Sequence, residues 1–163
     1  MAARWNEIRL AVMLLTRLPV GRLPEPAPPL PSAAWAYPVA GLVAALPAVL
    51  VFWAAQGLPP LMAALLALAA GSLATGALHE DGLADSADGF GGGTTRDRKL
   101  EIMKDSRIGS YGALALLLSL GLRISGLAAA PDATIGMAAL VGLGMASRAG
   151  LPSIMRILPT ARP

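Results

Sequence analysis

The sequence predicts an all-α fold, a polytopic transmembrane helical bundle with a cytoplasmic acidic segment of helix and loop. Three observations lead to this prediction. Hydrophobic residues make up 55% of the 163 residues and mean hydropathy is +0.62. Charged residues make up only 14%, against about 25% in a typical soluble domain. No Asp, Glu, Lys or Arg occurs in the 54 residues from position 26 to 79, whereas seven of the ten acidic residues lie between 80 and 105. We treat residues 1–163 as a single membrane domain.

Composition excludes several classes of site. The chain has no cysteine and one histidine, which excludes disulfides, thiolate metal sites and a His-rich zinc site. The pI near 10.0 is typical of nucleic-acid binders. However, the formal charge is only +3 and the basic residues form no long run. We therefore expect no nucleic-acid partner, and we interpret the basic residues as topology and phosphate-binding charges.

The N-terminal segment, residues 1–32, is amphipathic and ends in a proline-rich connector. Apolar side chains share one arc of a helical wheel over residues 1–23, and polar ones share the other. Such a helix lies along the membrane surface or packs on the rest of the protein, and the sequence leaves both possibilities open. Arg9 and Arg17 interrupt the apolar residues, so the segment is not a signal peptide.

The uncharged run predicts two membrane spans, at 33–56 and 61–78, separated by Pro59-Pro60. Small residues recur at every fourth position of the second span. This seam would serve packing within the bundle or self-association, so a homo-oligomer is an open possibility. The seam residues are Ala63, Ala67 and Gly71.

Two further spans are predicted at 109–130 and 133–151, close to Arg123 and Arg148. Basic residues occur in the N-terminal segment, in the polar segment 80–108 and near the C-terminal end. The turns at 57–60 and 131–132 contain none. By the positive-inside rule, the three basic regions are cytoplasmic.

The candidate chemistry lies in residues 80–108. Asp81, Asp85 and Asp88 are spaced i, i+4 and i+7, so a helix places all three carboxylates on one face. Like charges this close repel unless a cation lies between them. Oxygen ligands without histidine or cysteine favour a hard ion, Mg²⁺ or Mn²⁺. Gly89 and the glycines at 91–93 would end the helix and allow a ligand to approach the backbone closely.

A second helix is expected after Thr94 or Thr95, either of which can cap it. Acidic residues recur every four positions on it, with basic residues interleaved. Carboxylates and guanidinium groups together suit a metal ion plus a polyphosphate. The alternative is a solvated, salt-bridged segment without a ligand. The acidic residues are Asp97, Glu101 and Asp105, and the basic residues are Arg98, Lys104 and Arg107.

Other motifs give no support to other chemistries. The glycine run lacks the Lys-Ser/Thr ending of a P-loop. His79 is interpreted as a capping or packing residue rather than a base. Ser106, Ser110 and Tyr111 have no neighbouring base in sequence, which argues against a serine nucleophile.

Two motifs closely resemble the cobalamin synthase family, the adenosylcobinamide-GDP ribazoletransferases. They are H-E-D-G-L-A-D-S-A-D-G at 79–89 and L-E-I-M-K-D-S-R-I-G-S-Y-G at 100–112. L-L-T-R-L-P-V at 14–20 and Y-P-V-A-G at 37–41 are also similar to family patterns. Members of that family are longer, with more spans and a further acidic Gly-Thr motif. The sequence therefore resembles a member that lacks the C-terminal third.

The resemblance implies a Mg²⁺-dependent, nucleotide-displacing phosphotransferase of the bacterial inner membrane. It would join α-ribazole, or its 5′-phosphate, to adenosylcobinamide-GDP and release GMP. Matching the family motifs implies metal ligation by Asp81, Asp85, Asp88 and Glu101. It implies Asp105 as the base, with Lys104 and Arg107 holding the diphosphate and stabilising the departing GMP. The remaining substrate-binding candidates are Gly91, Gly92, Gly93, Arg98 and Ser106.

Two alternatives belong to other classes. A CDP-alcohol phosphotransferase carries D-G-x-x-A-R…G-x-x-x-D-x-x-x-D, which is partly matched here. However, Asp85 stands where that arginine belongs, and Leu78 stands where an aspartate belongs. A cation transporter usually places carboxylates near the bilayer midplane. The run 26–79 contains none, which argues against transport.

Overall fold

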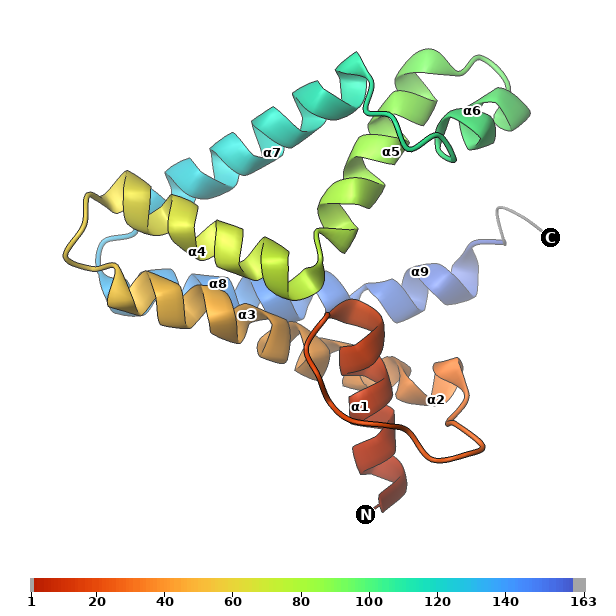
Figure 1. The fold of residues 1–163 in the computed structure, drawn as a ribbon, viewed down its shortest axis with the longest axis horizontal. Helices are drawn as coiled ribbons and strands as arrows, with labels where there is room; N and C mark the ends of the chain where they lie inside the picture. Colours follow the sequence, from red (N-terminus) through yellow and green to blue (C-terminus); the bar gives the residue numbers. More distant parts are fainter. Residues whose placement is uncertain (1, 160–163) are drawn as a thin grey trace.

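The computed structural model describes residues 2–159, and this part of the chain is helical without any β-strand (Figure 1). It confirms the predicted all-α, polytopic helical fold. The helices are α1 (Ala2–Leu15), α2 (Leu30–Ala33), a 3₁₀ turn η1 (Ala34–Ala36), α3 (Tyr37–Ala54), α4 (Pro60–Thr75), α5 (Leu78–Gly92), α6 (Arg96–Ile102), α7 (Ser110–Ala128), α8 (Ala133–Ala149) and α9 (Leu151–Ile157).

Three helical segments are long and apolar enough to cross a membrane: Leu30–Ala54, Ser110–Ala128 and Ala133–Ile157. They correspond to the spans predicted at 33–56, 109–130 and 133–151. The span predicted at 61–78 differs, because α4 ends at Thr75. It reaches the length of a span only together with α5, across a bend of 89°.

The bend between α4 and α5 is produced by two residues in the left-handed region, Gly76 (φ 65) and Ala77 (φ 56). The Arg17 side chain occupies the space that a Cβ on Gly76 would need. The Arg17 backbone N–H also donates to the Ala74 carbonyl at 2.8 Å, which satisfies an otherwise free helix-end acceptor. As a result, residues 80–92, predicted as the start of a polar segment, continue as helix in a new direction.

The bundle is built on α3, which packs against α4 on one side and α8 on another (Figure 1). The small-residue seam of α4 faces this interface: Ala63 and Ala67 are buried, and Gly71 faces Ala48. The seam therefore packs within the chain. Small residues at such contacts let helix backbones approach closely.

The N-terminal helix α1 packs on the bundle. Its buried side chains Ala11, Val12 and Leu15 form a cluster with Tyr37 and Ala40 of α3. Of the two placements that the sequence left open, packing on the rest of the protein is the one seen in the described residues.

The turns and the polar segment lie at two opposite ends of the molecule. The turn between α3 and α4 and the turn between α7 and α8 lie together on the left of Figure 1, whereas α6 and α9 lie on the right. The sequence predicted that these two turns share one side of the membrane and the polar segment lies on the other. Helix α5 carries the acidic residues toward that polar end and meets the start of α7 there.

Candidate active site

Helix α5 presents the three aspartates of the first motif. The predicted register is confirmed, since Asp81, Asp85 and Asp88 all lie on one continuous helix. Asp81 is exposed and Asp85 is half-buried. Within residues 2–159, neither of these two carboxylates makes a hydrogen bond or an ion pair. They are therefore available to bind a ligand.

Asp88, in contrast, accepts a hydrogen bond at each of its two carboxylate oxygens. Its Oδ2 accepts a hydrogen bond from the backbone N–H of Gly109 at 2.7 Å. Its Oδ1 accepts one from the N–H of Gly112 at 2.9 Å. Both donors belong to the first turn of α7, where backbone N–H groups lack intrahelical partners. Asp88 thus joins the C-terminal part of α5 to the N-terminus of α7.

Glu80 is held at the other end of the same helix. Its Oε1 accepts hydrogen bonds from Arg123 Nη1 of α7 at 2.8 Å and from the Ser72 hydroxyl of α4 at 3.3 Å. The Glu80 side chain is only 16% exposed. One carboxylate therefore connects three helices at the bend. His79, next to it, is exposed and has no side-chain hydrogen bond in this part of the chain, so the expected capping role is not seen.

A cage of protein ligands for a metal ion is not assembled here. Among residues 2–159, no group of three or more His, Cys, Asp or Glu side chains lies close enough to hold an ion. Asp81 and Asp85 nevertheless fit one divalent ion of the magnesium type, which is usually held by one or two carboxylates together with substrate phosphates. The assignment of Asp88 and Glu101 as metal ligands stays a prediction, and both side chains have other partners in this structure.

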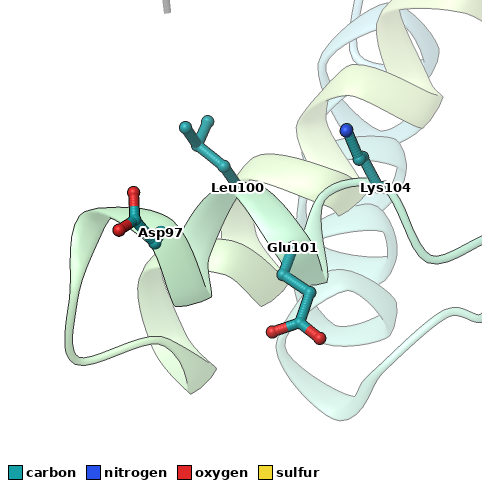
Figure 2. A pocket seen from close by; sticks show the side chains of 4 residues that line it. All are labelled: Asp97, Leu100, Glu101 and Lys104. Carbon is teal, nitrogen blue, oxygen red and sulfur yellow. The ribbon is translucent and has the colours of Figure 1, made fainter. Parts of the chain in front are cut away.

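Helix α6 carries the second group of charges. Thr95 is its N-cap, because its hydroxyl accepts from the Arg98 N–H at 3.3 Å. Asp97, Leu100, Glu101 and Lys104 line a surface pocket of about 250 Å³ (Figure 2). Asp97 and Leu100 extend to one side of the helix and Glu101 extends to the other (Figure 2). The two carboxylates therefore do not converge on one point.

Glu101 and Asp105 each form an ion pair with an arginine. Glu101 bonds Arg98 at 2.7 Å, which matches the alternative of a salt-bridged helix face. Asp105 bonds Arg107 at 2.6 Å. Hydrogen bonds from the Arg107 side chain and backbone lower the pKa of Asp105 from its ordinary value of 3.8 to about 2, and the same contact raises the pKa of Arg107. Asp105 is therefore ionised at neutral pH and is a weak base while this pair is intact.

The glycines at the end of α5 make room for side chains of this chain. The helix ends at Gly92, as the glycine run predicts. A Cβ at Gly91 would collide with the Tyr111 ring, and one at Gly93 would collide with Lys99. The glycines thus pack the end of α5 closely against α6 and the start of α7. Ser106 and Lys104 are exposed in the loop between α6 and α7.

The sequence of the chain matches one protein family over most of its length. The family model described as cobalamin-5-phosphate synthase matches residues 7–163. The chain belongs to the cobalamin-5-phosphate synthase family. Two adenosylcobinamide-GDP ribazoletransferases, from Bradyrhizobium diazoefficiens and Mesorhizobium japonicum, are 53% and 50% identical to it, each over 96% of this chain. One from Sinorhizobium medicae is 46% identical over 97% of it.

The chain spans about three fifths of the length of these relatives: 62%, 61% and 63%, respectively. No solved structure matches it.

Two residues of this family member were missed as contributors to the site's architecture. Glu80 was given no role from sequence, and Arg123 was noted only as a charge within a span. A signal was present for Arg123, since a charged residue inside an apolar segment usually has a charged partner. The pairing itself, across 43 positions, carries no local pattern.

Proposed function

We propose that the protein is a nucleotide-displacing phosphotransferase that joins α-ribazole, or α-ribazole 5′-phosphate, to adenosylcobinamide-GDP. A ribose hydroxyl that is free in both acceptors, and therefore not the 5′ one, would attack the phosphoryl group attached to cobinamide and lose its proton to a base of the site. A P–O bond forms there, the P–O bond to the GMP portion breaks, and GMP leaves with the bond's electrons. The observation that carries this proposal is the 53% identity to a relative of that name over 96% of the chain, with both charged motifs included.

Asp81 and Asp85 are the proposed ligands of Mg²⁺, because they are the two carboxylates of α5 without protein partners. When bound there, Mg²⁺ would neutralise charge on the substrate diphosphate. Asp88 and Glu101 already have protein partners, namely two backbone N–H groups and Arg98. The metal proposal therefore stands on the α5 pair.

Lys104, Arg98 and Arg107 are proposed to bind phosphate oxygens, as guanidinium and ammonium groups commonly do. Arg107 is 87% exposed, so it can turn from Asp105 toward an anionic ligand. The pKa of Asp105 would then rise from about 2 toward its ordinary value. One movement of Arg107 would thus bind the diphosphate and make Asp105 a better proton acceptor for the ribazole hydroxyl. Ser106 and the glycines at 91–93 remain proposed substrate contacts.

The proposed location is the bacterial inner membrane, with α6 and the adjoining loop at the cytoplasmic face. The basic residues of the polar segment support this orientation, and the turn between α7 and α8 contains none. A cytoplasmic site fits soluble nucleotide substrates. Assembly into a homo-oligomer stays a proposal without a specific contact to support it.

The test is GMP release from adenosylcobinamide-GDP and α-ribazole in liposomes, with Mg²⁺ or with EDTA. The assay uses this chain and a version extended to the length of its relatives. Magnesium-dependent release that Asp81→Asn abolishes and Asp132→Asn retains supports the proposal. Asp132 is a matched control because it caps α8 at the opposite end of the molecule. The proposal would be contradicted if the extended version released no GMP but turned over a CDP-alcohol.

A further inference from the structure

Helix α5 is fastened to α7 at two points, and the two unpartnered aspartates lie between them. We infer that Asp88 and Glu80 are positioning residues: they clamp α5 onto α7 and so orient Asp81 and Asp85 toward substrate. Only the orientation toward substrate rests on the proposed function, since the clamp itself is a property of the fold. It assigns Asp88 a role different from the metal ligation that its spacing predicts.

The Asp88 clamp is a helix cap supplied from another helix. The N-cap residue of α7 is Gly109, which has no side chain to bond the free N–H groups of the first turn. Asp88 bonds the N–H of the cap residue and of the third helical residue, Gly112, using both carboxylate oxygens. A carboxylate at a helix N-terminus also interacts favourably with the helix dipole. Both carboxylate oxygens of Asp88 thus contribute to the cap of α7.

The glycines of the second motif fit this contact. The three atoms nearest to a Cβ placed on Gly109 all belong to the Asp88 carboxylate, and the Cβ would collide with it. A Cβ on Gly112 would collide with the same carboxylate and with the Ala84 carbonyl. This contact therefore joins the two motifs at 79–89 and 100–112: the last aspartate of the first needs the glycines of the second.

The Glu80 clamp lies eight residues earlier, about 12 Å along the helix. It combines the Arg123 ion pair with the Ser72 hydrogen bond, and the Glu80 side chain is largely buried. Two fastenings on one helix fix its rotation as well as its position. Asp81 and Asp85 then keep one orientation relative to α7, and small displacements of reacting groups can cost about 100-fold in rate.

A double-mutant cycle tests the Asp88 clamp without any need for turnover. Thermal unfolding is measured in nanodiscs for Asp88→Ala, Gly109→Ala and the double variant. Each single change lowers the melting temperature, the first by uncapping α7 and the second by collision. In the double variant the collision is gone, so its melting temperature should equal that of Asp88→Ala. Additive losses would overturn the clamp. Asp132→Ala with Gly142→Ala is the control cycle, since the two residues have no contact and should be additive.

Hydrogen exchange gives a second, activity-independent reading. In Asp88→Ala, peptides covering 108–115 should exchange at least about 10-fold faster, because the first turn of α7 loses its acceptors. Asp81→Asn should leave these peptides unchanged. Unchanged exchange in Asp88→Ala would overturn the clamp. Glu80→Gln is examined in the same way at 119–125. Glu7→Gln is the control, because the Glu7 side chain is buried to a similar degree and its partners, Arg4 and Trp35, lie in α1 and η1.

Kinetics of the version extended to family length then separate positioning from ligation. Asp88→Ala and Glu80→Gln should lower kcat by about 10- to 100-fold, while KM and the half-maximal Mg²⁺ concentration stay within about threefold. Asp88→Asn, which keeps one acceptor oxygen, should recover part of the rate. A rise in the half-maximal Mg²⁺ concentration as large as that of Asp81→Asn would show ligation and overturn the assignment. If the wild type shows no turnover, the proposed function fails. The double-mutant cycle of thermal unfolding and the hydrogen-exchange measurement still test whether Asp88 clamps α5 to α7.

Discussion

The α3–α4–α8 bundle and the α5–α6–α7 end are held together by different chemistry. In the bundle, alanine and glycine bring helix backbones together, as where Gly41 of α3 lies against the Gly144 backbone of α8. At the other end, directional bonds between charged groups and backbone make the contacts, as Asp88 and Glu80 illustrate. The bundle depends on shape summed over many small contacts, whereas the polar end depends on a few bonds. A change in the bundle should cost stability, whereas loss of an unpartnered carboxylate at the polar end, Asp81 or Asp85, should cost activity.

The largest expected effect is on activity, from Asp81→Asn or Asp85→Asn. Removing one of the two unpartnered carboxylates should lower the rate of GMP release by about 10²- to 10⁴-fold, the range typical for a group that acts directly in the reaction. The melting temperature should stay within error, because neither carboxylate has a partner in the described part of the chain. Comparable loss in Asp132→Asn would show that the assay reports folding rather than chemistry.

The next effect is on stability, from Gly41→Ala. The added methyl group would meet the Gly144 backbone, which cannot move aside as a flexible side chain can. The helix pair must separate, at a cost of about 1–3 kcal/mol by analogy with overpacked cores. Chemical denaturation in mixed micelles measures the change. Gly142→Ala on α8 is the matched control, since its new Cβ meets nothing.

A smaller effect is expected from Thr95→Ala. The Thr95 hydroxyl is the N-cap acceptor of α6, and losing such a cap costs about 1 kcal/mol. Because α6 has only seven residues, the loss should appear as faster hydrogen exchange over 96–102. Thr94→Ala is the control, and equal exchange in both variants would contradict the cap.

The smallest effect concerns the titration of Asp105. Its pKa is about 2 in the folded protein against an ordinary 3.8. The contact with Arg107 therefore favours the folded state above pH 3.8, and this contribution disappears as the pH falls toward 2. In Arg107→Ala the pKa should return toward 3.8, as followed by the NMR chemical shift of the Asp105 carboxyl carbon. An unchanged midpoint would show that Arg107 is not the cause.

The same contrast governs what the sequence could predict. The spans near 33–56, 109–130 and 133–151 follow from apolar runs, and the register of Asp81, Asp85 and Asp88 follows from helical spacing. These are local patterns. The 89° bend was not predicted, because it depends on Gly76 and on Arg17 from a distant segment.

The partners of the acidic residues were equally inaccessible from local pattern. Asp88 finds its donors 21 and 24 positions away, and Glu80 finds Arg123 43 positions away. Spacing placed Asp88 with its neighbours on α5 as a ligand, whereas the fold gives it two backbone donors. A salt-bridged helix face was foreseen as the alternative, with Asp97, Glu101 and Lys104 as the pairing residues, whereas in the structure Glu101 pairs with Arg98.

The most direct test of this division compares one variant from each region under the same conditions. Single-turnover GMP release and melting temperature are measured for Asp81→Asn and Gly41→Ala, in a chain of family length and at a temperature where both are folded. Asp81→Asn should lose the rate and keep the melting temperature. Gly41→Ala should keep the rate and lose melting temperature. If Gly41→Ala loses the rate as fully as Asp81→Asn does, or if Asp81→Asn melts as early, chemistry and stability are not divided between the two regions and the account is wrong.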